Sequence, residues 1–441
     1  MKKGLFIVLL IAQSMVAQTI SGNFPELKAA QVLLRGYNGF QEHELATTTT
    51  DSAGNFTLTY PKEYVGAALL QIKNSKSIIV LLNHENFSMS WSNLQDINTL
   101  QFANSIENEA FTKGITLNQE IESKLTGLKF LLPQYKTTSK QHKWLQQEIR
   151  QQTQRFQNHL NQLPKTSYAR YYLKIRKLIT DMPLTANRYI ERMPKHEEDF
   201  KNLNFSEDYL WHSGLLNELF DGFYQLMESH IEVEKVTQHA NLATDEWVKN
   251  LATQPTKQQD VAEHCFKWLE KRSLFAAAEH LAKAMLNQTN CQIDQKRTNL
   301  FEQYRKLAIG NPAPNIQLNN NQWLSTLNSN YILVAFGARW SPNCQTDYPK
   351  LNQGYKNLKD TYGLEIVYIS IDTDKNAFET YYKDALFITH CDTQGWETQA
   401  AKDYHIFATP TYILLDKNLK IVAKINTPEH LEAWLQAHKG Q

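Results

Sequence analysis

Short apolar runs separated by glycine, asparagine and proline fill the chain from Gln18 to about Asn104. After Asp51-Ser52-Ala53-Gly54-Asn55, which has the composition of a hairpin turn, Phe56, Leu58 and Tyr60 alternate with polar residues. A period of two places these three side chains on one face of a strand. We therefore predict a small antiparallel β-sandwich over residues 18–105.

From Ile106 to about Leu307 the apolar spacing changes to the period of a helix. The first stripe consists of Leu145, Ile149, Phe156, Leu160 and Leu163, and the second of Tyr168, Tyr171, Tyr172, Ile175, Leu178 and Ile179. Pro183 is expected to stop the helix that carries the second stripe. Further helices are predicted over residues 207–231, 258–271, 274–286 and 294–307. We interpret the region 106–305 as a helical domain whose aromatic stripes form its core.

The last third of the chain alternates strands with helices. Apolar and β-branched runs predict strands over residues 331–336, 363–371, 386–390, 412–415 and 419–425. Helical patterns lie between or after them, over residues 376–382, 396–404 and 428–438. This order predicts an α/β domain over residues 306–441, with a largely parallel sheet covered on both faces.

The stretch from Tyr331 to Pro349 reads as a strand, a turn with Gly337 and Trp340, and a helix that begins near Ser341-Pro342-Asn343-Cys344. It resembles the TlpA-like branch of the thioredoxins, whose pattern here is a strand, Trp-Cys-x-x-Cys, an acid and a proline. Trp340 matches the family tryptophan, Cys344 the second cysteine, Asp347 the acid and Pro349 the proline. Gly310-Asn311-Pro312-Ala313-Pro314 resembles the start of this domain in the family. The resemblance implies a multidomain protein with an N-terminal β-sandwich, an all-α middle region and a C-terminal α/β thioredoxin-like domain.

Ser341 stands where the family has its nucleophilic first cysteine. In a C-x-x-C site that cysteine attacks a substrate disulfide as a thiolate, and the second cysteine resolves the mixed disulfide. A serine hydroxyl is far less acidic than a thiol and forms no disulfide, so dithiol cycling between positions 341 and 344 is excluded. Ser341 followed by proline also suits a helix N-cap and first turn.

Downstream, Ala408-Thr409-Pro410-Thr411 precedes a predicted strand. The family resemblance implies that Thr409-Pro410 is a cis bond facing the cysteine pair, where the backbone pairs with an extended substrate. It also implies that Trp340 contributes to substrate binding. Two interpretations of Asp347 stay open. Its carboxyl group either transfers protons at the second cysteine, as the resemblance implies, or only forms a structural hydrogen bond within the helix region. Cys391 is either a buried structural cysteine or a displaced partner for Cys344.

The N-terminus has Lys2 and Lys3, an apolar run from Leu5 to Ala12, and small or polar residues up to Ala17. This pattern predicts a secretory signal peptide over residues 1–17, and the run is too short to span a bilayer. The absence of cysteine before Cys265 argues against a lipoprotein, and no later segment reads as a membrane span. The predicted location is the bacterial periplasm, where disulfides are permitted.

A net charge of +1 gives no electrostatic case for nucleic acid or an anionic membrane surface. No two of the 14 histidines are three or four residues apart, so no helical two-histidine metal site is expected. We likewise expect no cofactor, because nucleotide-binding glycine motifs are absent. Two hypotheses remain for the function. The first is a binding or scaffold module for an extended peptide or an envelope protein. The second is an oxidoreductase that uses Cys344 alone or with Cys391 on a thiol or disulfide partner.

Overall fold

The structure is a computed structural model that describes residues 17–72, 77–188, 190–229, 233–272, 274–287, 301–302, 305–318, 322–406 and 408–438. The predicted signal peptide lies outside these residues apart from Ala17, as do Cys291 and most of the helix predicted over 294–307. The chain divides into two compact units, Met1–Val233 and Glu234–Gln441, which we describe separately. The division falls within the predicted helical domain, so helices belong to both units.

The first unit begins with two four-stranded sheets, in the orders β4-β1-β7-β8 and β3-β2-β5-β6. The strands are β1 (Ala17–Asn23), β2 (Gln31–Asn38), β3 (Gln41–Thr49), β4 (Asn55–Pro61), β5 (Gly66–Ile72), β6 (Ser77–Leu82), β7 (Phe87–Trp91) and β8 (Leu100–Ala103). Phe56, Leu58 and Tyr60 are buried together in a core to which both sheets contribute. The predicted sandwich is confirmed, with one difference. Strands β1 and β7 pair in parallel, whereas the other described pairs of these sheets are antiparallel.

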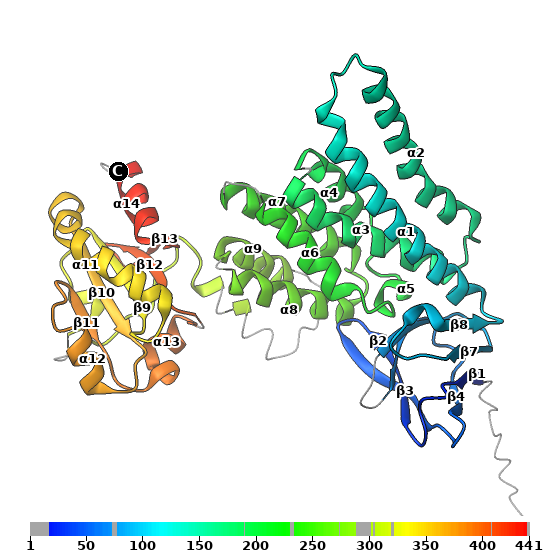
Figure 1. Ribbon diagram of the computed structural model, residues 1–441. Helices are drawn as coiled ribbons and strands as arrows, with labels where there is room; N and C mark the ends of the chain where they lie inside the picture. The colour runs from blue at the N-terminus through cyan, green and yellow to red at the C-terminus, as the bar shows by residue number, and fades with distance from the viewer. Residues whose placement is uncertain are drawn as a thin grey trace, which may run out of the picture. The chain divides into compact units, whose positions relative to one another are not determined.

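Helices follow the sandwich in the first unit (Figure 1). They are α1 (Ile106–Leu131), α2 (Lys140–Gln162), α3 (Tyr168–Arg188), α4 (Met193–Lys201), α5 (Asp208–Trp211) and α6 (Leu216–Glu228). The prediction that Pro183 ends a helix is wrong, since α3 continues through it to Arg188. The Pro183 ring is exposed, while the neighbouring Met182 and Thr185 are buried, so packing of the inner face holds the helix together. The helix predicted over 207–231 is divided into α5 and α6 at Gly214, which has a φ of +70°.

The second unit contains α7 (Val233–Asn250), α8 (Pro255–Lys271) and α9 (Phe275–Leu286), followed by a five-stranded sheet in the order β11-β10-β9-β12-β13. Its elements are β9 (Tyr331–Gly337), α11 (Pro342–Tyr362), β10 (Leu364–Ser370), α12 (Lys375–Tyr381), β11 (Ile388–His390), α13 (Gln399–Asp403), β12 (Thr411–Asp416), β13 (Ile421–Ile425) and α14 (Pro428–Ala437). Side chains from α11 and α14 cover one face, and side chains from α13 and from residues 307–318 and 322–327 cover the other.

The prediction of a largely parallel sheet is corrected by the pairing of β12. Strands β9, β10 and β11 are parallel, but β12 runs antiparallel to β9 and forms a hairpin with β13. The short connection from Asp416 to Ile421 permits only an antiparallel β12–β13 pair, whereas parallel neighbours need a long crossover. The sheet is therefore mixed. Among the described residues, no helix combines the length and the apolar character needed to cross a membrane.

Candidate functional site at the start of helix α11

The candidate site begins where β9 ends, at Gly337. A Cβ atom at this position would overlap the hydroxyl of Tyr368, which comes from the neighbouring strand β10. The carbonyl of Gly337 accepts a hydrogen bond from the amide of Ile371 at 2.9 Å. Glycine is thus required by close packing of two central strands, and the turn that follows leads to Ser341 at the N-terminus of α11.

Ser341 is the N-cap residue of α11 and Pro342 is the first helical residue, in agreement with the sequence pattern. Its side chain, however, does not cap the helix. The Ser341 hydroxyl instead donates a hydrogen bond to the Thr409 carbonyl at 3.2 Å. The Thr409–Pro410 bond is cis, as the family resemblance implied. With only 5% of its surface exposed, Ser341 links the start of α11 to the loop before β12.

Cys344 lies in the first turn of α11 with 2% of its surface exposed. Burial raises the pKa values of four tyrosines, and proximity to Cys344 raises each of them further; they are Tyr368, Tyr381, Tyr382 and Tyr412. These side chains come from β10, from the end of α12 and from β12. The thiol is therefore buried in the neighbourhood of these four tyrosines, which we call the tyrosine enclosure. Sequence reasoning missed this enclosure because its members are far apart in the chain and belong to separate elements.

Asp347 lies on the same helix and accepts a hydrogen bond from the Tyr412 hydroxyl at 3.1 Å. Lys350 is 4.0 Å from the other carboxylate oxygen, and Lys350 is also paired with Glu429 at 2.7 Å. Burial raises the pKa of Asp347 above its ordinary value of 3.8, while the Tyr412 hydrogen bond opposes that shift. The Asp347 carboxyl is thus hydrogen-bonded to one member of the tyrosine enclosure, and its side chain is only 14% exposed.

Replacing Asp347 by asparagine is expected to stabilise the protein more at neutral than at acidic pH. A raised pKa means that the protonated acid is favoured in the folded chain. The stabilisation from this group is present below pH 3.8 and is lost as the pH rises through the folded pKa. Asparagine resembles the protonated acid at every pH. Urea unfolding of both proteins at about pH 4 and about pH 7 measures the difference. Asp360→Asn, at an exposed position of the same helix, is the control, and an equal effect at both pH values would contradict the assignment.

Cys391 follows β11 and is partly buried, with its thiol donating to the Asp372 carbonyl at 3.2 Å. Burial raises the pKa of this thiol, which disfavours the thiolate. Cys344 and Cys391 are both free thiols in the structure and form no disulfide with each other.

Trp340 is the exposed part of the site, with 51% of its surface accessible. Its ring lies edge-on to that of Trp396, which belongs to the short 3₁₀ helix Gly395–Glu397 and is also exposed, with ring centroids 6.4 Å apart. The preceding residue, Arg339, donates its amide to the buried carboxylate of Asp372 at 3.1 Å. Sequence reasoning identified Trp340 but missed Trp396 and Asp372, for which the printed sequence contains no local signal.

These residues define a thioredoxin-like domain, in which the helix after the first central strand meets a cis-proline loop. Comparison with known proteins agrees, because residues 328–421 match the family described as thioredoxin-like. Human nucleoredoxin is 27% identical over 111 residues, which are 24% of this chain and 25% of the relative. The chain therefore spans about a quarter of the length of such curated relatives.

Two solved structures are also similar to this chain. A thioredoxin-like protein from Bacteroides caccae is 16% identical, with a TM-score of 0.43 over 56% of this chain and 94% of that one. A thiol-disulfide oxidoreductase from Bacteroides fragilis is 28% identical, with a TM-score of 0.26 over 30% of this chain and 98% of that one. In the described part of the chain, no group of three or more His, Cys, Asp or Glu side chains is arranged to hold a metal ion.

Proposed function

We propose that this chain is an exported, TlpA-like thioredoxin protein that binds an extended peptide of an envelope protein without exchanging disulfides. The observation that carries the proposal is the hydrogen bond from the Ser341 hydroxyl to the Thr409 carbonyl, at 3.2 Å. An alcohol thus occupies the position from which a thiolate would attack. Export is supported by the two N-terminal lysines and the short apolar run after them.

The surroundings of Cys344 argue against the alternative of a monothiol enzyme. A reacting thiol needs access to the substrate sulfur and an environment that favours its thiolate. Cys344 is only 2% exposed, so its thiol is not accessible to a substrate disulfide in the folded chain. A route through Cys391 is also disfavoured, because burial raises the pKa of that thiol.

The features that support peptide binding remain accessible. Trp340 and Trp396 expose 51% and 40% of their surfaces, and large aromatic side chains are frequent energetic centres of protein interfaces. The cis loop at Thr409–Pro410 is half-buried next to Ser341, where its backbone can meet an extended strand. The carbonyl of Thr409 has a second lone pair beyond the one used by Ser341.

The test uses an array of unstructured peptides to find a ligand, followed by affinity measurements on variants. Trp340→Ala is expected to weaken binding at least about tenfold, because it removes an exposed aromatic anchor. Cys344→Ser is expected to leave the affinity unchanged. Trp144→Ala, at an exposed tryptophan of α2, is the matched control. Reduction of insulin by the wild-type protein, abolished in Cys344→Ser, would contradict the proposal and support the oxidoreductase alternative.

A further inference from the structure

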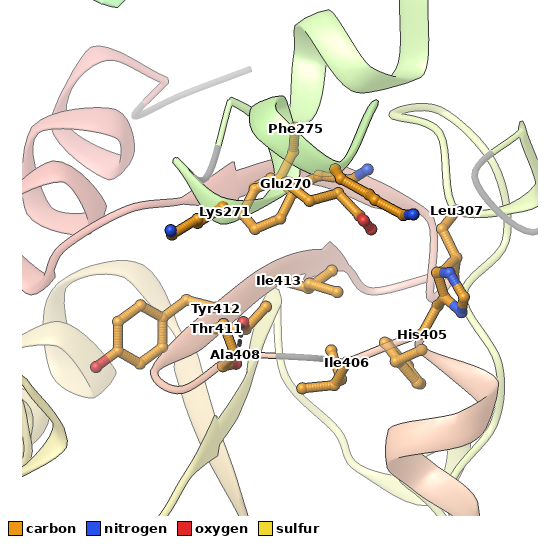
Figure 2. Close-up of a pocket in the computed structure, with 13 residues that line it drawn as sticks. Glu270, Lys271, Phe275, Leu307, His405, Ile406, Ala408, Thr411, Tyr412 and Ile413 are labelled. Carbon is orange, nitrogen blue, oxygen red and sulfur yellow. Dashed lines mark hydrogen bonds between the residues drawn. The ribbon is translucent and has the colours of Figure 1, made fainter. Parts of the chain in front are cut away.

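A cavity of about 330 Å³ lies in the second unit between the α8–α9 hairpin and the strands β12 and β13. Figure 2 shows Phe275, Glu270 and Lys271 of the hairpin on one side, and Ile413, Ile406 and Ala408 on the other. The volume falls within the range of small-molecule sites, roughly 300–1,000 Å³. Tyr412 of the candidate site also lines this cavity, but Ser341, Cys344 and Trp340 do not, so the cavity is a neighbouring and distinct feature of the thioredoxin-like domain and the helices before it.

The surface of the cavity is apolar, and its charges are mainly positive. Side chains of Phe275, Leu307, Ile406 and Ile413 provide hydrocarbon and aromatic walls. The charged residues in the lining are three lysines, Lys267, Lys271 and Lys424, and one glutamate, Glu270. Lys267 is paired with Glu263 at 2.6 Å and Lys424 lies 3.9 Å from Glu279, and both of these glutamates are outside the lining. Apolar walls beside lysine ammonium groups match a ligand that has a hydrocarbon body and one negative charge.

Lys424 is the cation placed deepest. It lies on β13 opposite Ile413 of β12, and its side chain is only 12% exposed. Its ammonium is 3.9 Å from the Glu279 carboxylate and 5.9 Å from the centre of the Phe275 ring. Glu279 also forms an ion pair with Lys283 at 2.6 Å, so its carboxylate interacts with two lysines. The Lys424 ammonium thus lies at the cavity wall, beside an aromatic ring and within reach of a ligand carboxylate.

We propose that this cavity binds a small amphipathic carboxylate, of the size of a medium-chain fatty acid, with its chain against Phe275 and Ile413 and its carboxylate toward the lysines. The cavity also adjoins the candidate site along the chain. Ala408 and Thr411 line it and flank Thr409–Pro410, and the Thr411 hydroxyl donates to the Ala408 carbonyl at 2.8 Å. An occupant therefore contacts the same loop that accepts the Ser341 hydroxyl.

Calorimetric titration of the full chain with sodium octanoate tests this assignment, with 1-octanol as the uncharged probe. Octanoate is expected to bind saturably, one molecule per chain, with a Kd below about 1 mM, and octanol at least about tenfold more weakly. Lys424→Met is expected to reduce octanoate affinity at least about tenfold and to leave octanol binding unchanged. Lys417→Met, at an exposed lysine between β12 and β13, is the matched control.

Ala408→Trp is a second variant that tests the same proposal if Lys424→Met fails to fold. Ala408 is exposed at the cavity, so a larger side chain is accommodated by the fold while it fills the space available to a ligand. This variant is expected to abolish saturable octanoate binding. Equal affinities for octanoate and octanol, or octanoate binding that persists in Ala408→Trp, would overturn the proposal. Because Lys424 belongs neither to the pair Trp340 and Trp396 nor to the Thr409–Pro410 loop, the peptide affinity of Lys424→Met, measured in parallel, separates this result from the proposed function.

Discussion

Replacing Ser341 by cysteine is expected to give this domain a disulfide-reducing activity that the wild-type chain lacks. The new thiol would occupy the N-cap position of α11, three residues before Cys344, where the helix N-terminus favours a thiolate. Cys344 would then act as the resolving thiol. We expect insulin reduction at least about tenfold above the wild-type rate, and a disulfide between positions 341 and 344 after mild oxidation. Insulin turbidity and peptide mapping measure the two effects.

The double variant Ser341→Cys with Cys344→Ser is the control for that prediction. It retains the introduced nucleophile but cannot resolve a mixed disulfide, so turnover should fall back to the wild-type level while trapped mixed disulfides accumulate. An inactive Ser341→Cys variant with an intact fold would show that the thioredoxin-like domain has lost more than its first cysteine. A wild-type rate equal to that of the variant would contradict the role assigned to Ser341.

The largest expected effect on stability comes from Glu107, in the first turn of α1. Its carboxylate, 5% exposed, accepts hydrogen bonds at the start of α3 from the Ala169 amide at 2.6 Å, the Tyr168 amide at 3.1 Å and the Ser167 hydroxyl at 2.9 Å. It thereby satisfies amides that have no partner within α3 and places a negative charge at the positive end of that helix.

Glu107→Ala is expected to destabilise the first unit by about 2–4 kcal/mol, because it leaves these buried donors without an acceptor. Hydrogen exchange followed by mass spectrometry measures the loss of protection in α3, and the second unit serves as an internal reference. Glu109→Ala, at an exposed glutamate of the same helical turn, should change the stability by less than about 0.5 kcal/mol. Equal effects of the two substitutions would contradict this role of Glu107.

Much of the fold follows from periodicity in the sequence. The alternation of Phe56, Leu58 and Tyr60 marked a buried strand face, and the order of elements after residue 306 indicated the α/β domain. What periodicity could not supply was pairing between distant strands, such as β1 with β7 and β12 with β9. It also could not show that packing on Met182 and Thr185 carries α3 past Pro183.

The candidate site was predictable only as far as local motifs reach. The pattern from Trp340 to Pro349 and the Thr409–Pro410 pair located the start of the helix and the cis loop. The direction of the Ser341 hydroxyl depends on the position of a carbonyl 68 residues later, which no local pattern encodes. The tyrosine enclosure and the pair formed by Trp340 and Trp396 likewise arise only when separate elements are brought together.

The central claim is that Cys344 takes no part in thiol chemistry in the folded protein, and thiol alkylation tests it most directly. The native, purified protein is alkylated with and without prior reduction, and the cysteines are then mapped by mass spectrometry, with a urea-unfolded sample as reference. We predict that Cys344, 2% exposed, stays unmodified and unpaired in both native samples and reacts only after unfolding. Rapid native alkylation of Cys344, or its recovery in a disulfide with Cys391 before reduction, would contradict the account.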